Sequence, residues 1–167
     1  MANMIPISTV TVGSGGASSI VFSSIPQTYN DLIVKYSARN NSANGTLLVK
    51  YNNDGTAGNY VYRQIYGDGS AVYADAQSDM FFGTVPRSTY TASTFGNGEI
   101  YIPNYNSSSQ KSATTDSVSE NNATTSIASL WTRQWTGTAP IDSITLYLYT
   151  GSFVQYSTAT LYGIRKY

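Results

Sequence analysis

The sequence of 167 residues contains no cysteine and no histidine. Without cysteine, the chain has no disulfide, no thiolate nucleophile and no Cys-ligated metal. Without histidine, it has no Ser-His-Asp triad, no His-ligated metal and no side chain that ordinarily titrates near neutral pH. Charge is also scarce, because only 11% of residues are charged and 9 basic residues balance 9 acidic ones. We therefore expect no nucleic-acid partner, and the composition favours a structural or binding module over an enzyme.

Long apolar runs are missing as well. The first residues, 1–6, contain neither a basic region nor an apolar stretch of the length typical of a signal peptide. The other apolar runs are only a few residues long, so we expect no membrane-spanning segment and no membrane partner. A chain of this length suits one domain that is large enough to bury a core without disulfides or metals.

Small polar residues and tyrosine replace the missing types. Ser, Thr and Asn make up about a third of the chain, and there are 15 tyrosines. Apolar residues alternate with polar ones in Asp31–Arg39, Thr46–Tyr51 and Asn59–Tyr66, with turn-forming residues between these segments. Alternation with a period of two is typical of half-buried strands. The three segments therefore predict a meander of consecutive antiparallel strands.

The second half of the chain continues this pattern. Lys111–Ser119 alternates between two mostly polar faces, which predicts an edge strand or a lightly covered one, and Asp142–Tyr149 shows the clearest alternation. Only Ala71–Gln77 is compatible with a short helix. With about ten strands and regular turns, the sequence predicts an all-β fold, a single antiparallel β-sandwich of the jelly-roll type.

The N-terminal segment has two interpretations. Residues 1–16 contain a β-prone stretch, Met1–Val12, followed by the flexible Gly13–Gly16, and residues 17–167 form the sandwich domain. The stretch is either an arm that pairs with a neighbouring subunit or the first strand of the same sheet. The second interpretation, a first strand followed by a Gly-rich hairpin, is favoured.

The sequence gives little support for a catalytic site or a metal site. Asp68, Asp75 and Asp79 lie close together and could supply paired carboxylates, but nothing in the sequence sets the distance between them that a glycosidase requires. The loop Asn52–Gly55 resembles part of a calcium loop but lacks the terminal glutamate. Turn formation explains these residues more simply, so we assign no catalytic residue, no cofactor and no metal.

The aromatic residues are better candidates for function. Exposed Tyr and Trp side chains bury a large area on binding, and they also stack on sugar rings. Fifteen tyrosines exceed what one small core can hold, so some must lie at an interface. The interface candidates are the alternating aromatics of two strands and the apolar residues of the N-terminal stretch: Ile5, Ile7, Val10, Trp131, Trp135, Tyr147 and Tyr149.

Two segments carry a family resemblance. Phe22–Leu32, with the sequence FSSIPQTYNDL, and Gly151–Ile164, with the sequence GSFVQYSTATLYGI, together resemble small virion structural proteins of tailed bacteriophages. The resemblance implies a β-sandwich that is synthesised in the host cytoplasm and assembled into the phage particle, more often on the capsid surface than in the tail. It implies no catalytic motif. The middle of the chain, from Tyr66 to Ser126, takes no part in the resemblance.

Two functions follow from the resemblance and the composition. The first is a capsid decoration or cement protein, whose partners are the major capsid protein and copies of itself, for example in a trimer, and which stabilises the shell through many modest contacts. The second is a tail or fibre-associated module that recognises a host-surface glycan through exposed Tyr and Trp. Copy number in the particle distinguishes the two hypotheses.

Overall fold

The computed structural model describes residues 3–121 and 126–165. It contains two antiparallel sheets that pack as a sandwich, so the predicted all-β fold is confirmed. The larger sheet has the order β1 (Asn3–Thr11), β12 (Thr158–Arg165), β3 (Asp31–Ala38), β8 (Gly96–Pro103), β9 (Lys111–Glu120), β10 (Ser126–Trp135), β5 (Tyr60–Gly67) and β6 (Val72–Gln77). The smaller sheet has the order β2 (Ser19–Phe22), β11 (Ile144–Leu148), β4 (Thr46–Tyr51) and β7 (Phe81–Thr84). One 3-10 turn, η1 (Ala57–Asn59), precedes β5.

The chain crosses repeatedly between the two sheets. Strand β3 belongs to the larger sheet, β4 to the smaller one and β5 to the larger one again. The predicted meander of these three segments is therefore wrong. A strand buried on one face shows the same alternation whichever sheet it joins, so the period of the sequence located the strands but not their partners.

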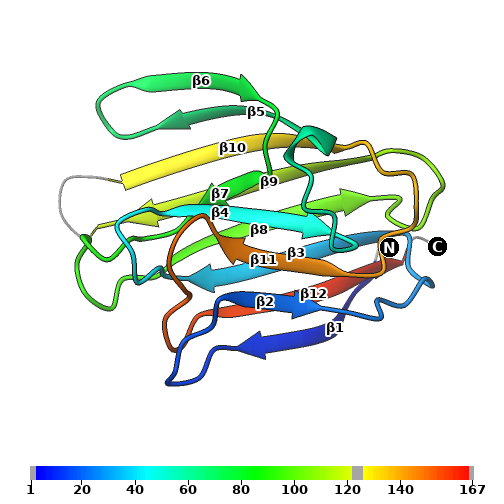
Figure 1. The fold of residues 1–167 in the computed structure, drawn as a ribbon, viewed down its shortest axis with the longest axis horizontal. Coiled ribbons are helices and arrows are strands. Elements are labelled where there is room, and N and C mark those ends of the chain that lie inside the picture. Colours follow the sequence, from blue (N-terminus) through cyan, green and yellow to red (C-terminus); the bar gives the residue numbers. More distant parts are fainter. Residues whose placement is uncertain (1–2, 122–125, 166–167) are drawn as a thin grey trace.

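The core is most apolar where β2, β11 and β4 lie over β12, β3 and β8 (Figure 1). Each of these strands turns alternate aliphatic side chains inward. The fully buried ones include Ile20, Leu32, Val34, Leu47, Val49, Ile100, Ile102, Ile144, Leu146 and Leu161. We call this part of the sandwich the aliphatic half. Burial of several such side chains, each worth about 1.5–3 kcal/mol, supplies most of the driving force for folding.

The rest of the sandwich has a different interior, which we call the polar half. Here β7 lies against β9 and β10, and the inward face of β9 consists of Lys111, Ala113, Thr115, Ser117 and Ser119, all buried. The prediction of an edge or lightly covered strand was wrong for this segment, because β9 pairs on both sides, with β8 and β10. The polar side chains of this segment led to the prediction that it is exposed to solvent. Many of them are instead buried and form hydrogen bonds within the sandwich.

Ser117 shows how a buried hydroxyl is accommodated. Its Oγ accepts a hydrogen bond from the Thr84 backbone N–H at 3.2 Å and lies 2.7 Å from Ser129 Oγ. Ser129 Oγ in turn accepts a bond from the Trp131 indole at 2.8 Å. The small residue Gly83 also lets β7 approach β9 closely. A Cβ added at this position would lie only 3.2 Å from Ser117 Oγ. The polar face of β9 is thus a packing surface for the smaller sheet.

Residues 72–77 form β6 rather than the short helix that the sequence allowed. The strand pairs along its length with β5, from Tyr62↔Gln77 to Gly67↔Val72. Asp68 closes the connecting turn, because its Oδ1 accepts bonds from Ser70 and from the Ala71 backbone N–H. Pairing with β5 and a well-formed turn outweigh the weak helical preference of the alanines.

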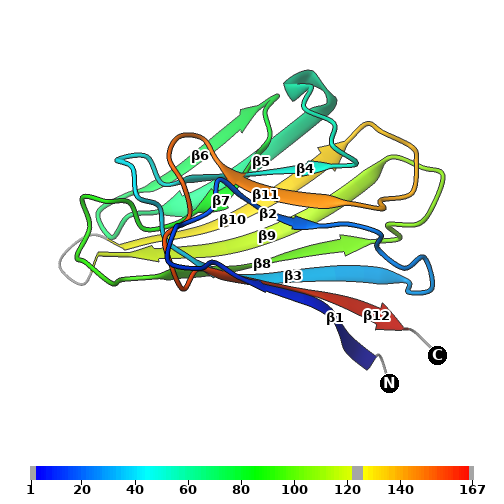
Figure 2. The same ribbon diagram turned by 60° about the horizontal axis from the view of Figure 1, so that its bottom comes forward.

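The smaller sheet is too narrow to cover the larger one. Figures 1 and 2 show the β5–β6 hairpin extending past β7 at one side, and β1 at the opposite side. Residues 3–11 of the predicted arm or strand form β1, which pairs with β12 of the same chain, while residues 1 and 2 lie outside the described residues. The inward face of the β5–β6 hairpin is therefore left accessible.

Candidate functional site

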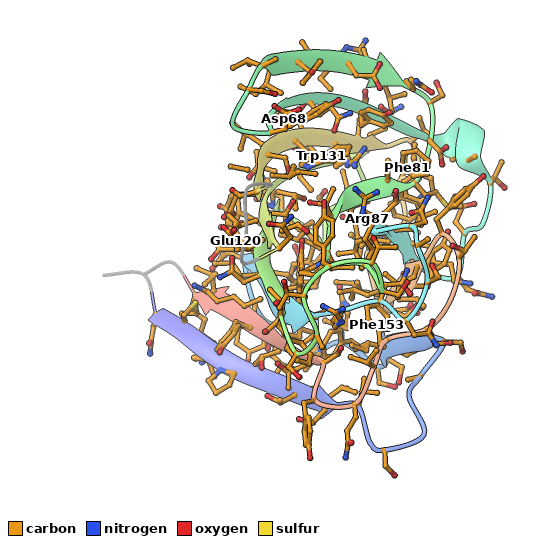
Figure 3. All side chains as sticks on the ribbon, turned by 90° about the vertical axis from the view of Figure 1, so that its left-hand side faces the viewer. Asp68, Phe81, Arg87, Glu120, Trp131 and Phe153 are labelled. Carbon is orange, nitrogen blue, oxygen red and sulfur yellow. The ribbon has the colours of Figure 1, made fainter. Side chains whose placement is uncertain are left out.

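The overhang of β5 and β6 creates a groove beside β7 with a volume of about 350 Å³. Figure 3 shows Trp131 of β10 and Phe81 of β7 below the β5–β6 hairpin. The groove is lined by aromatic rings, amides, hydroxyls and one carboxylate: Thr46, Tyr62, Gln64, Tyr66, Asp75, Gln77, Phe81, Gly83, Thr84, Ile127, Ser129 and Trp131. A mainly apolar lining with a few polar groups is the usual composition of a small-molecule site.

One of two stacked tyrosines, Tyr66, lines the groove, and the other, Tyr73, lies beside it. Tyr66 on β5 and Tyr73 on β6 are direct cross-strand partners, and their rings lie 4.9 Å apart with an interplanar angle of 20°. Tyr73 is 43% exposed. Cross-strand aromatic pairs stabilise a hairpin, and this pair also keeps an aromatic surface open to solvent.

Asp75 lies in the next cross-strand row, opposite Gln64. Its Oδ2 accepts bonds from the Tyr62 hydroxyl at 2.9 Å and from Gln77 Nε2 at 3.3 Å. The Tyr62 bond, followed by the Ala76 backbone N–H, holds the pKa of Asp75 below its ordinary value. Burial raises the pKa of Tyr62 to about 12, and its bond to Asp75 acts in the same direction. Asp75 is therefore an oriented carboxylate that stays ionised at neutral pH.

A buried cation lies behind the groove. The guanidinium of Arg133 is 4.5 Å from the Trp131 ring centroid and 4.6 Å from those of Tyr62 and Phe82. Arg133 is only 4% exposed, and burial lowers its pKa. None of its guanidinium nitrogens has a hydrogen-bond partner in the part of the chain that the structure describes. Three aromatic faces therefore stabilise the charge of Arg133. The cation in turn restrains Tyr62 and Trp131, two of these rings that line the groove.

The groove continues into a smaller hollow. Thr46, Thr84 and Ile127 line both spaces, and the hollow, of about 190 Å³, extends to Arg87 and Tyr90. Arg87 lies over the Tyr90 ring at 4.8 Å and donates to its hydroxyl at 3.2 Å. The lining of the two spaces thus includes aromatic rings from three strands, β5, β7 and β10, and from the loop residue Tyr90.

The opposite face of the same strands carries exposed aliphatic residues. Ile65 is 53% exposed, Leu130 50%, Val118 40% and Val72 82%. The register places Leu130 beside Ile65 and Ala128 beside Val118. A shallow hollow of about 360 Å³ lies among them. We call Ile65, Val72, Val118, Ala128 and Leu130 the outer patch.

The two tryptophans proposed as interface residues are buried. Trp131 and Trp135 are each 4% exposed. The Trp135 indole donates to Asp54 Oδ2 at 2.9 Å, and its ring packs against Tyr51 and Tyr60. This overturns the expectation that both indoles are free to contact a partner. Alternation placed them correctly on one face of β10, but that face is the inside of the sandwich.

The remaining interface candidates divide between the core and the surface. Ile7 and Val10 are half-buried and pack against the core, and Ile5 is half-buried on β1. Tyr147 is half-buried, and its hydroxyl donates to Met80 Sδ at 3.3 Å. Only Tyr149 is largely exposed, at 59%. Its ring packs edge-on against Phe81, 5.9 Å between centroids, so it borders the groove.

The acidic residues considered for catalysis lie in different environments. Hydrogen bonds to Asp68 from Ala71 and Ser70 lower its pKa to about 2, which suits a turn and is the opposite of what a general acid requires. Asp79 accepts a bond from the Met80 backbone N–H at 2.6 Å. Within residues 3–121 and 126–165, no cluster of three acidic side chains could hold a metal ion.

The sequence interpretation missed Tyr66 and Tyr73 as site residues and considered Asp75 only as a carboxylate for catalysis. The alternation of Tyr60, Tyr62 and Tyr66 placed these tyrosines on one face, but nothing showed that the smaller sheet ends before it covers Tyr66. Treating Ala71–Gln77 as helix also separated Tyr73 and Asp75 from β5. The useful signal was the turn Gly67–Ser70, which is short enough to join two paired strands.

Comparison with protein-family models and with curated proteins gave no match for this chain. In the described part of the chain, no helix has the length and apolar character needed to cross a membrane. The groove and the outer patch are therefore the features that bear on function.

Proposed function

We propose that this protein is a structural component of a phage particle, a decoration protein that binds the major capsid protein and copies of itself. The resemblance of Phe22–Leu32 and Gly151–Ile164 to virion proteins supports this function. The observation that carries it is the outer patch, which exposes four large aliphatic side chains on neighbouring strands.

An exposed aliphatic patch is costly for a free protein because it remains in contact with water. Such patches typically mark contact surfaces with other proteins. Within the outer patch, Ile65 and Leu130 are direct neighbours across the β5–β10 pairing. Each Å² of apolar surface that docking removes from water contributes about 25 cal/mol. Repeated many times over a shell, even a weak contact of this kind becomes strong through avidity.

The open edge of β1 is less suited to assembly by strand addition. Pro6 lies within β1 and cannot donate a backbone hydrogen bond, and the pairing with β12 shifts register between Pro6 and Ser8. Prolines and bulges are common devices that protect sheet edges from pairing with another chain. We therefore favour docking through the outer patch over an N-terminal clamp.

Copy number in purified particles tests the decoration role. Quantitative mass spectrometry relative to the major capsid protein should give hundreds of copies per particle. Removing the protein should also lower the resistance of particles to heat or osmotic shock. A few to a few dozen copies would contradict this proposal and indicate a tail position.

Substitutions test the docking surface. The double variant Ile65→Thr/Leu130→Thr places residues with high strand propensity in both strands but removes most of the aliphatic area. We expect it to rebind particles stripped of the protein at least about tenfold more weakly. Thr132→Ala, on the same face of β10, is the matched control and should rebind like the wild type. Equal binding of all three proteins would contradict docking through the outer patch.

A further inference from the structure

The groove beside β7 lies on the inner face of β5, β6 and β10, whereas the outer patch lies on the opposite face of the same strands. A particle protein docked through the outer patch would leave the groove open to solvent. We propose that this groove binds a neutral oligosaccharide. This site is independent of how the protein is anchored.

The stacked pair Tyr66 and Tyr73, which we call the aromatic platform, favours a sugar ligand. The partly exposed rings of Tyr66 and Phe81 line the groove, and the exposed ring of Tyr73 stacks on Tyr66 beside it. Tyr62 and Trp131 also line the groove but are only 2% and 4% exposed, so they form its buried base. A pyranose ring has an apolar face of C–H groups that packs on an aromatic ring, while its hydroxyls remain free to form hydrogen bonds at the ring edge. Tyr62 and Trp131 are held at 5.4 Å between centroids, and Arg133 fixes both from behind. The surface is therefore preorganised, which lowers the entropic cost of binding.

The pattern of polar groups also favours a sugar ligand. The inward rows of the β5–β6 hairpin place Gln64 and Asp75 between the tyrosine pair and Tyr62. Amide and carboxylate groups beside aromatic rings are suited to sugar hydroxyls, which both donate and accept hydrogen bonds. Asp75 Oδ2 already receives bonds from Tyr62 and Gln77, so the carboxylate is fixed in orientation before any ligand arrives.

The charge of the groove lining selects the charge of the ligand. Among the described residues that line the groove itself, Asp75 is the only charged side chain, and Arg87 lies in the adjoining hollow, where it is paired with the Tyr90 ring. An ionised carboxylate in this position repels uronic acids and sialic acids at close range. Arg133 is buried behind Tyr62 and Trp131 and offers no contact to a ligand. A neutral glycan avoids the repulsion and can still donate hydroxyl hydrogens to Asp75.

The experiment uses isothermal titration calorimetry on the full chain. The neutral probes are maltohexaose, cellohexaose, laminarihexaose and mannohexaose, and the acidic comparison is hexagalacturonate. We expect at least one neutral hexasaccharide to bind and the acidic one to bind at least about tenfold more weakly. Absence of binding to every neutral probe, or tighter binding of hexagalacturonate, would overturn the proposal.

Variants of the hairpin locate the binding. Tyr73→Ala removes an exposed half of the platform and should weaken binding of the neutral probe at least about tenfold. Asp75→Asn should weaken it severalfold and reduce the discrimination against hexagalacturonate. Val72→Ala, the neighbouring residue on the opposite face of β6, is the matched control and should bind like the wild type. Thermal unfolding of each variant checks that it is folded, and equal losses in Val72→Ala and Tyr73→Ala would refute the assignment.

Discussion

The two halves of the sandwich solve the same packing problem with different residues. In the aliphatic half, Leu32, Val34 and Leu161 are fully buried against the smaller sheet. In the polar half, the corresponding layer contains Thr115, Ser117 and Ser129, and the cation Arg133. Dry aliphatic packing maximises stability, whereas buried polar groups lower it unless they are fully paired. The difference indicates that the aliphatic half supplies most of the stability. The role of the polar half is to form the groove.

The largest expected effect comes from the aliphatic half. Ile100 on β8 is fully buried, and its direct cross-strand neighbour on β9 is Thr115. Ile100→Ala should lower the free energy of unfolding by about 2–5 kcal/mol, because it removes buried methyl groups and leaves a cavity. Urea denaturation measures this loss. A loss below about 1 kcal/mol would show that this half is not the main source of stability.

A pair of substitutions at Arg133 examines the polar half. Arg133→Ala should lower the free energy of unfolding by about 2 kcal/mol or more, because it empties the space between three aromatic rings. Arg133→Met fills that space without a buried charge and should leave stability unchanged or raise it. Guanidinium denaturation of both variants tests this. A Met variant as unstable as the Ala variant would mean that the cation itself is needed for stability.

Thr115 lies opposite Ile100 at the boundary of the two halves. The effects of substitutions on stability can therefore be compared between the two positions. Thr115 Oγ1 is buried and has no hydrogen-bond partner in the described part of the chain. Thr115→Val keeps the shape and removes the unsatisfied hydroxyl, so it should raise the free energy of unfolding by about 1 kcal/mol. Thermal unfolding should show this as a rise of about 2–4 °C. A fall in the melting temperature would indicate that the hydroxyl is paired in solution.

The smallest expected effect involves Asp54, which ties β10 to the β4–η1 connection. Burial alone would raise its pKa, but hydrogen bonds from Trp135, Asn59 and Thr56 outweigh this and lower the pKa to about 2. Because the folded-state pKa lies below the unfolded one, this contribution is present above about pH 4 and is lost as the pH falls towards 2. Asp54→Asn should cost about 0.5 kcal/mol at neutral pH and reduce the acid-induced loss. Urea midpoints between pH 2 and pH 5 test the prediction, and parallel curves for variant and wild type would contradict it.

The sequence predicted the β-sandwich and the inward faces of most strands, because burial on one face leaves a period of two. It could not assign strands to sheets, as β3, β4 and β5 show. It also predicted that polar β9 is an edge strand or a lightly covered one, since the hydrogen bonds that satisfy Ser117 come from β7 and β10 and are not visible in the order of residues. The groove depends on where the smaller sheet ends, and that is a property of the assembled fold.

The most direct test of this division measures stability and binding on the same two variants. Ile100→Ala is predicted to lower the melting temperature clearly while, below its transition, it binds the best neutral hexasaccharide within about twofold of the wild type. Tyr73→Ala is predicted to keep the melting temperature within about 2 °C of the wild type while binding falls at least about tenfold. If Ile100→Ala impaired binding as strongly as Tyr73→Ala, or if Tyr73→Ala destabilised the fold as strongly as Ile100→Ala, the separation of stability and recognition would be contradicted.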